Sequence, residues 1–300
     1  MKIAITTPTG HVGSAVAEFL LDFGGDIQVK LLARRPDKLS GFVRRGAEMS
    51  IGSLDDVGYL TGAMHDVDAL FWATPPGLGS DNLRAFQRRF GQAAATAVRD
   101  SHLPRVVNLS SIGAELDSGA GPINGLHDVE QLLNESADNV THLRPGFFFE
   151  NLLGQIDSIR QSGTISLPLS GSKRFPMIAC RDIAQAAAQR LADGSWTGHS
   201  VEELHGPADV SFDDVAQILS EATGRKITFV RCDRQQARQA ILDHAVSENT
   251  TDAMLELYDA AESGKLRTIQ RRSPRTTTST KLADFARNVM LPLLAEQVAR

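Results

Sequence analysis

The sequence contains few of the residues that build disulfide frameworks or metal centres. Among its 300 residues there are two cysteines, Cys180 and Cys232. Two cysteines are too few for a disulfide framework or a cysteine-rich metal site. His199 and His205 lie six residues apart with two glutamates between them, which is not a typical spacing of metal ligands. We therefore expect no metal site.

A positive charge excess and a long apolar run are also missing. The formal net charge is -5, so there is no overall basic field of the kind that attracts nucleic acid. No apolar run approaches the roughly 18 residues that would suggest a membrane span, and no signal peptide fits before the first motif. We expect a cytoplasmic protein with a small-molecule substrate and with neither nucleic acid nor membrane as a partner. A homodimer is left open.

Short apolar runs alternate with helical patterns through the first half of the chain. Because these runs are apolar on both faces, they indicate a parallel sheet that is covered on both sides. Right-handed crossovers then give a doubly wound α/β (Rossmann) sheet. The pattern predicts strands at 2–6, 27–33, 47–51, 68–73, 105–109 and 140–143, with helices at 11–23, 36–45, 56–64, 82–101 and 126–136.

After about residue 146 the pattern is less regular. Helices are predicted at 179–192 and 211–223, strands at 201–204 and 227–231, and the remainder is mostly helical. We interpret residues 1–150 as a dinucleotide-binding domain. Residues 151–300 are interpreted as a smaller, mostly helical α/β region that packs on it from the substrate side.

The first strand leads into a turn that suits a pyrophosphate group. Such a turn needs a backbone that can approach the ligand and a helix whose N-terminus points at it. Gly10 provides the close approach and Gly13 lets the helix pack on the strand, while Thr7 stands where a first glycine is usual. The predicted cofactor contacts here are Thr7, Thr9, Gly10, His11, Val12 and Gly13.

The end of the second strand favours NADP(H) over NAD(H). An acidic residue at this point would bind the ribose hydroxyls of NAD, but the sequence has Arg34 and Arg35 there, with Lys38 one turn further on. A guanidinium group pairs with a phosphate through two hydrogen bonds. We therefore expect Arg34, Arg35 and Lys38 to bind the 2′-phosphate; the alternative is a solvated basic turn.

The chain resembles the NmrA-like family of atypical short-chain dehydrogenases/reductases, which bind NAD(P). Motifs in the first 155 residues carry most of this resemblance, and residues 181–184 and 224–227 extend it more loosely. The motifs are Thr7–Gly13, Ala33–Lys38, Trp72–Pro76, Asn108–Ser111 and Leu143–Asn151.

The resemblance implies the rest of the site. It implies that Thr74 and Pro75 line the cofactor, that Ser110 lies near the nicotinamide, and that residues 145–151 form the floor between cofactor and substrate. In that segment we assign Pro145 and Phe148 to the cofactor. Phe147, Phe149 and Asn151 are assigned to the substrate, because aromatic rings at a strand end can bind a flat molecule. For each phenylalanine the alternative is a place in the core.

The Tyr-x-x-x-Lys pair of classical short-chain dehydrogenases is missing, since the only tyrosines are Tyr59 and Tyr258. His127 stands at the tyrosine position and Gln131 at the lysine position. Histidine can act as a general acid near neutral pH, and Glu130 on the same helical face could orient it. His127 and Ser110 are therefore the catalytic candidates; the alternative for His127 is a structural role.

Two functions follow from these features. The first is an NADPH-dependent reductase that transfers hydride to a small conjugated or aromatic acceptor, such as a quinone, an enone or an imine, because the cofactor itself carries the difficult chemistry. The second is a non-catalytic redox sensor that binds NADP(H) and a protein partner, which the missing Tyr–Lys pair favours. We favour the reductase, because about half of the chain lies outside the nucleotide domain.

Overall fold

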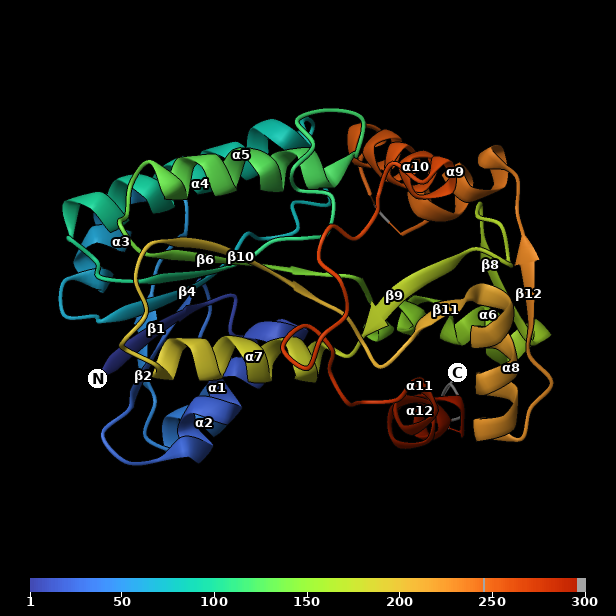
Figure 1. The fold of residues 1–300 in the computed structure, drawn as a ribbon, viewed down its shortest axis with the longest axis horizontal. Coiled ribbons are helices and arrows are strands. Elements are labelled where there is room, and N and C mark those ends of the chain that lie inside the picture. The colour runs from blue at the N-terminus through green and yellow to red at the C-terminus, as the bar shows by residue number, and fades with distance from the viewer. Residues whose placement is uncertain (245, 296–300) are drawn as a thin grey trace.

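The computed structural model describes residues 1–244 and 246–295. Its centre is a parallel sheet of seven strands in the order β10-β6-β5-β4-β1-β2-β3 (Figure 1). These strands are β1 (Lys2–Thr6), β2 (Gln28–Ala33), β3 (Glu48–Ile51), β4 (Ala69–Ala73), β5 (Val106–Leu109), β6 (Val140–Pro145) and β10 (His199–Leu204). The prediction of a doubly wound parallel sheet is confirmed.

Helices cover both faces of this sheet (Figure 1). One face carries α3 (Val57–Met64), α4 (Leu83–Asp100) and α5 (Pro122–Asn134), and the other carries α1 (His11–Phe23), α2 (Ser40–Arg44) and α7 (Cys180–Ala192). Each layer encloses its own apolar core, with Leu60 and Phe90 on the α4 side and Leu20 and Ile183 on the α1 side. Burial of these apolar side chains stabilises the packing of the helices on the sheet.

The second half of the chain builds a smaller region beside the carboxyl ends of the central strands (Figure 1). Its core contains Phe212 and Phe285. It comprises two small sheets, β7 (Phe147–Phe148) with β9 (Arg174–Ile178) and β11 (Asp209–Ser211), and β8 (Thr164–Leu167) with β12 (Thr228–Arg231). Its helices are η1 (Phe149–Gln155), α6 (Ile156–Ser162), α8 (Phe212–Thr223), α9 (Arg234–Leu242), α10 (Glu248–Ser263), α11 (Leu282–Phe285), η2 (Ala286–Met290) and α12 (Leu291–Ala295).

Two elements that follow residue 150 complete the central sheet. Strand β10 pairs in parallel with β6, and α7 packs against α1 beneath the sheet. The predicted boundary at residue 150 therefore marks a change in the sequence pattern only. The central sheet and its helices include elements from both sides of that boundary. Two helices also differ in their bounds from the prediction. Helix α5 begins at Pro122, where a proline suits the first helical position, and α2 is shorter than 36–45.

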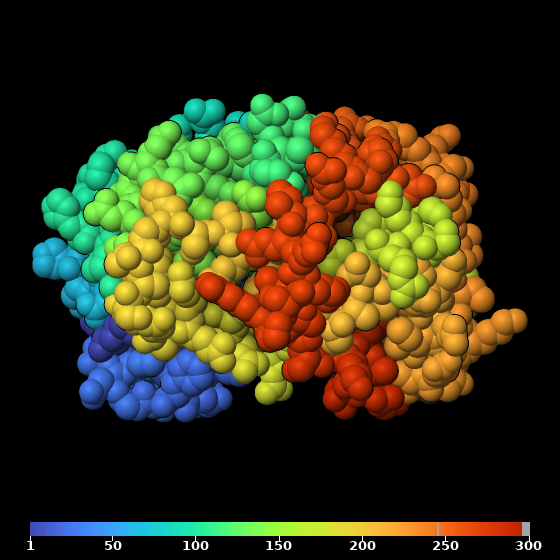
Figure 2. All heavy atoms as spheres, viewed as in Figure 1, coloured from blue at the N-terminus to red at the C-terminus, as the bar shows by residue number. Residues whose placement is uncertain are grey.

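A non-helical segment, residues 265–281, runs across the junction between the two regions (Figure 2). The Glu203 carboxylate, at the end of β10, accepts hydrogen bonds from the backbone N–H groups of Ile269 and Gln270, both at 2.9 Å. The Lys265 ammonium donates to the Ser118 carbonyl at 2.7 Å. This segment thus ties α10 to the central sheet. In the described residues no helix is long and apolar enough to cross a membrane.

The two strands that flank the predicted cofactor site are joined by a buried hydroxyl group. Thr6 is fully buried at the end of β1. Its Oγ1 accepts the backbone N–H of Ala73 at 2.8 Å and donates to the carbonyl of Phe71 at 3.1 Å, both on β4. This link fixes the ends of β1 and β4 where the strand order reverses, which is where such sheets bind ligands.

We predict that Thr6→Val lowers the free energy of unfolding by about 1–3 kcal/mol, since the Ala73 N–H would be buried without a partner. Chemical denaturation measures this loss. The matched control is Thr228→Val on the exposed face of β12, which we expect to change stability by less than about 0.5 kcal/mol. Equal effects of the two substitutions would contradict the role given to the Thr6 hydroxyl.

Candidate cofactor site

The turn after β1 is closed by a backbone hydrogen bond and by an unusual backbone angle. Gly10 N donates to the Thr7 carbonyl at 3.0 Å. Thr7 has φ 47, a left-handed conformation that glycine adopts freely and a β-branched residue rarely does. The residue that replaces the first glycine therefore keeps a glycine-like conformation, and the tight turn is preserved without it.

Helix α1 begins at this turn with its N-terminus free to bind an anion. Gly10 is its N-cap, no side chain caps it, and its first turn contains no acidic residue. The first backbone N–H groups of a helix have no partner within the helix, and the helix dipole places partial positive charge there. These groups suit a pyrophosphate.

Gly13 allows the helix to start so close to the strand. A Cβ at Gly13 would lie 2.3 Å from the Thr7 carbonyl oxygen, whereas a Cβ at Gly10 would be 3.5 Å from the same atom. Gly13 is thus required by the packing of α1 on the turn. Gly10 has room within the protein, so its lack of a side chain benefits a ligand that approaches the backbone.

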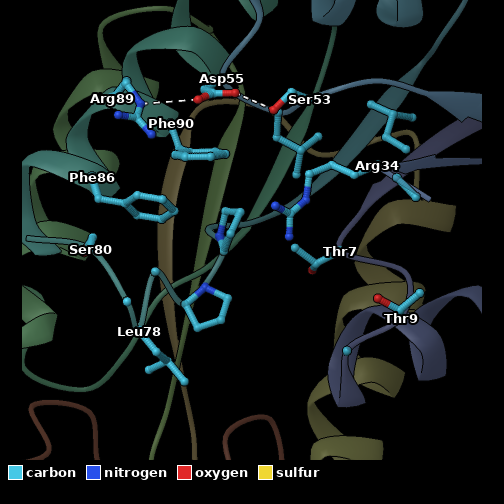
Figure 3. A pocket seen from close by; sticks show the side chains of 18 of the residues that line it. Thr7, Thr9, Arg34, Ser53, Asp55, Leu78, Ser80, Phe86, Arg89 and Phe90 are labelled. Carbon is cyan, nitrogen blue, oxygen red and sulfur yellow. Dashed lines mark hydrogen bonds and ion pairs between the residues drawn. The ribbon is translucent and has the colours of Figure 1, made fainter. Parts of the chain in front are cut away.

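A cavity of 1310 Å³ opens beside this turn (Figure 3). It is lined from the β1 turn, the end of β2, the segment after β3, the β4–α4 loop and the first turns of α4. Its lining includes Thr7, Pro8, Thr9, Gly10, Leu32, Ala33, Arg34, Arg35, Asp37, Lys38, Ser53, Leu54, Asp55, Pro75, Leu78, Ser80, Phe86, Arg89 and Phe90. Of the residues predicted to contact the cofactor, Thr7, Thr9, Gly10, Arg34, Arg35, Lys38 and Pro75 meet at this one cavity.

The basic end of the cavity matches the 2′-phosphate of NADP(H). Arg34, Arg35 and Lys38 are exposed at the end of β2, and Figure 3 shows Arg34 pointing into the cavity. The structure gives these three side chains no ion pair with another described residue. Their hydrogen-bonding capacity is therefore available to an anionic ligand.

The opposite wall was not identified from the sequence. Asp55 follows β3 and accepts a hydrogen bond from the Ser53 hydroxyl, while Arg89 lies 3.3 Å from it across the gap to α4. The rings of Phe86 and Phe90 complete this wall (Figure 3). Aromatic rings next to a carboxylate suit a purine, whose ring can stack and whose amino group can donate. The signal in the sequence was the aromatic and basic residues one turn apart on α4.

Further along the strand ends lie the residues predicted near the nicotinamide. Thr74 accepts the indole N–H of Trp72 at 3.1 Å, which fixes its hydroxyl. The Ser110 side chain follows β5 and is 4% exposed, and its hydroxyl has no hydrogen-bond partner among the described residues. A buried hydroxyl without a partner is costly, and the polar carboxamide of a nicotinamide would satisfy it. Pro145 ends β6 beside this position.

The expected pairing of His127 with Glu130 is wrong. His127 Nδ1 donates to the Ala114 carbonyl at 2.9 Å. Both oxygens of Glu130 instead accept from the Arg144 guanidinium, at 2.9 Å and 2.6 Å. Arg144 lies on β6, and this buried bidentate pair ties α5 to the sheet. Gln131, at the lysine position, is exposed to solvent.

The aromatic segment after β6 serves mainly as core. Phe149 is 2% exposed, with its ring 5.6 Å from that of Phe285, so its predicted substrate contact does not fit. Phe147 is half-buried and meets Phe212 edge-on at 5.6 Å, and Phe148 packs against the α1-side core. Asn151 is exposed. His11 is exposed and Val12 is buried at the start of α1, so only backbone atoms of Val12 can face a ligand there.

Comparison with known proteins identifies the family of this chain. The model of the NmrA-like family matches residues 1–278. The chain belongs to the NmrA-like family. The resemblance deduced from the motifs is thereby confirmed, including its extension into the second half.

Several of the similar proteins are named as reductases or oxidoreductases. The NAD(P)H azoreductase of Xenophilus azovorans is 31% identical over 289 residues, covering 95% of this chain and 96% of that protein. Quinone oxidoreductase 2 of Escherichia coli is 25% identical over 268 residues, or 88% and 89% of the two chains. The triphenylmethane reductase of Citrobacter sp. has the same fold, with a TM-score of 0.81, 21% identity and coverage of 97% and 100%. The NADPH complex of the E. coli NADPH-dependent quinone oxidoreductase also has this fold, with a TM-score of 0.80, 21% identity and coverage of 95% of this chain and 98% of that one.

We predict that substitution by alanine has different effects at the two glycines of the turn. Gly13→Ala places a methyl group against the Thr7 carbonyl, so we expect a loss of about 1–3 kcal/mol of stability together with loss of cofactor binding. Gly10→Ala should leave stability nearly unchanged and weaken only the binding of NADPH. Thermal unfolding and NADPH titration of both variants measure these effects. Wild-type stability of Gly13→Ala would contradict the packing described here.

Proposed function

We propose that this protein is an NADPH-dependent reductase of small conjugated or aromatic acceptors, such as quinones, enones and imines. The observation that carries the proposal is the basic end of the cavity, where Arg34 has no ion pair with another described residue and lies beside the start of α1, which no described side chain caps. The broader class, an NAD(P)H-dependent oxidoreductase, is also that of its named relatives. The azo and quinone groups in those names are conjugated acceptors of the proposed kind.

Residues of the cavity and of the neighbouring strand ends would hold four parts of the cofactor. The backbone N–H groups of α1 and the Gly10 turn hold the pyrophosphate, and Arg34, Arg35 and Lys38 hold the 2′-phosphate. Phe86 and Asp55 hold the adenine. Pro75, Thr74 and Ser110 then follow along the strand ends toward the nicotinamide, which supplies the hydride when NADPH is bound.

The reaction also needs a proton for the reduced acceptor. We propose His127 as its donor, acting together with the Ser110 hydroxyl. Because His127 Nδ1–H is engaged by the Ala114 carbonyl, the neutral ring carries only a lone pair on Nε2. His127 can therefore donate a proton from Nε2 only as the imidazolium.

This role predicts a loss of turnover when the side chain is changed. His127→Gln should lower kcat by at least about 100-fold, while the Kd of NADPH stays the same. Steady-state kinetics and NADPH titration of both forms are the measurements. An unchanged kcat in the variant would leave His127 with only its structural contact to Ala114.

Turnover itself separates the reductase from a regulator that only binds the cofactor. We expect steady oxidation of NADPH with at least one acceptor from a panel of quinones, enones, imines and azo dyes. Tight binding of NADPH without turnover of any acceptor would disprove the reductase and favour the sensor.

Cofactor choice tests the basic end of the cavity directly. Arg34→Ala should weaken NADPH binding by about 1.5–3 kcal/mol, the range for hydrogen bonds to charged groups, and leave NADH nearly unchanged. Arg44→Ala is the matched control, since Arg44 is exposed on α2 and does not line the cavity. Fluorescence titration with both nucleotides gives the two Kd values. An equal loss for NADPH and NADH would overturn the assignment of Arg34.

A further inference from the structure

The charged side chains around the cavity do not all favour a phosphate. Four cations line it, but so do three carboxylates, which leaves a small positive excess. The cations are Arg34, Arg35, Lys38 and Arg89, and the carboxylates are those of Asp37, Asp55 and Asp81. The net effect on an anionic ligand therefore depends on how each carboxylate is compensated.

Asp55 is the carboxylate that is held in the cavity wall. Its side chain is 29% exposed, and the Ser53 hydroxyl donates to one of its oxygens. Figure 3 shows Ser53, Asp55 and Arg89 along one side of the cavity, with Arg34 extending from the other. An uncompensated negative charge at this place would repel the doubly charged 2′-phosphate that Arg34 is proposed to bind.

Arg89 supplies the compensating charge. Its Nε lies 3.3 Å from the Asp55 carboxylate. Its guanidinium carbon also lies 5.4 Å from the centre of the Phe86 ring and 5.5 Å from that of Phe90. Two aromatic faces on its own helix thus hold the guanidinium beside Asp55. The Arg89 side chain is itself 59% exposed, and these contacts place its charge at the wall of the cavity.

We propose that Arg89 sets the preference for NADPH over NADH by neutralising Asp55, without binding the 2′-phosphate itself. This inference rests on the proposed function, because it assumes that NADPH occupies the cavity. Asp55 can then remain in the wall as a hydrogen-bond acceptor for the adenine, while its charge no longer opposes the phosphate. Arg89 is accordingly a specificity-determining residue that acts through Asp55.

Coulomb's law sets the size of the expected effect. A carboxylate about 10 Å from a doubly charged phosphate, at an effective dielectric constant of about 60, changes the relative affinity by roughly sixfold before salt screens it. The interaction crosses a partly open cavity, so salt should screen it. The Debye length is about 30 Å in 10 mM salt and falls below about 8 Å above physiological ionic strength.

The test compares the ratio of the Kd values for NADH and NADPH in wild type and in Arg89→Met. Methionine keeps an aliphatic contact with the two rings and removes the charge. We expect the ratio to fall about fivefold at roughly 10 mM salt and less at high salt. Arg88→Met is the matched control. Arg88 is exposed on the same helix but does not line the cavity, so its removal should change the ratio little.

A second substitution distinguishes compensation from direct contact. In the Arg89→Met variant, adding Asp55→Asn should restore the wild-type ratio, because no charge is left to compensate. Using a ratio of two nucleotides cancels any loss of adenine binding or of packing that affects both equally. If the double variant keeps the low ratio of Arg89→Met, or if Arg89→Met behaves like Arg88→Met, the proposal is overturned. A wild type that does not prefer NADPH would instead refute the cofactor assignment of the proposed function.

Discussion

The close contact between the Gly13 backbone and the Thr7 carbonyl fixes the position of the proposed pyrophosphate site. Only a residue without a side chain lets α1 start immediately above the end of β1. That start directs the free N–H groups of the helix toward the gap between β1 and β4, where the strand order reverses. The Thr6 hydroxyl holds the two strand ends at that gap. The proposed anion site is thus a consequence of main-chain packing, and it needs few particular side chains.

The chemistry of the cavity is added to this frame by side chains from distant parts of the sequence. The basic residues come from the end of β2, the carboxylate from the segment after β3, and the aromatic wall from α4. Strand β2 and helix α4 are held by apolar faces buried in the sheet layers, whereas β3 is an exposed edge strand and the segment after it is anchored by the buried Leu54. The charged side chains at the cavity are largely exposed and can vary without disturbing the core, whereas Phe90 belongs to both the cavity wall and the core.

Features that depend on local sequence could be predicted, and those that depend on distant partners could not. The strands of the first half are short, mostly apolar runs, and the basic residues at the end of β2 directly follow their strand, so both could be predicted from the sequence. The role of Glu130 could not, because its partner Arg144 lies on a different element and a buried guanidinium attracts a carboxylate more strongly than a half-buried imidazole does. The wall formed by Asp55 and Arg89 joins residues 34 positions apart, and no local pattern marks such a pair.

The far edge of the sheet explains why the second half cannot be treated as a separate unit. Strand β6 faces α5 through His142 and Arg144. Burial lowers the pKa of His142 to about 4, so its neutral ring accepts from Asn108 and donates to Asn134 on α5. On its other edge β6 pairs with β10, whose Glu203 holds the segment 265–281. Helix α5 and the segment 265–281 are therefore both anchored at the β6–β10 edge of the central sheet.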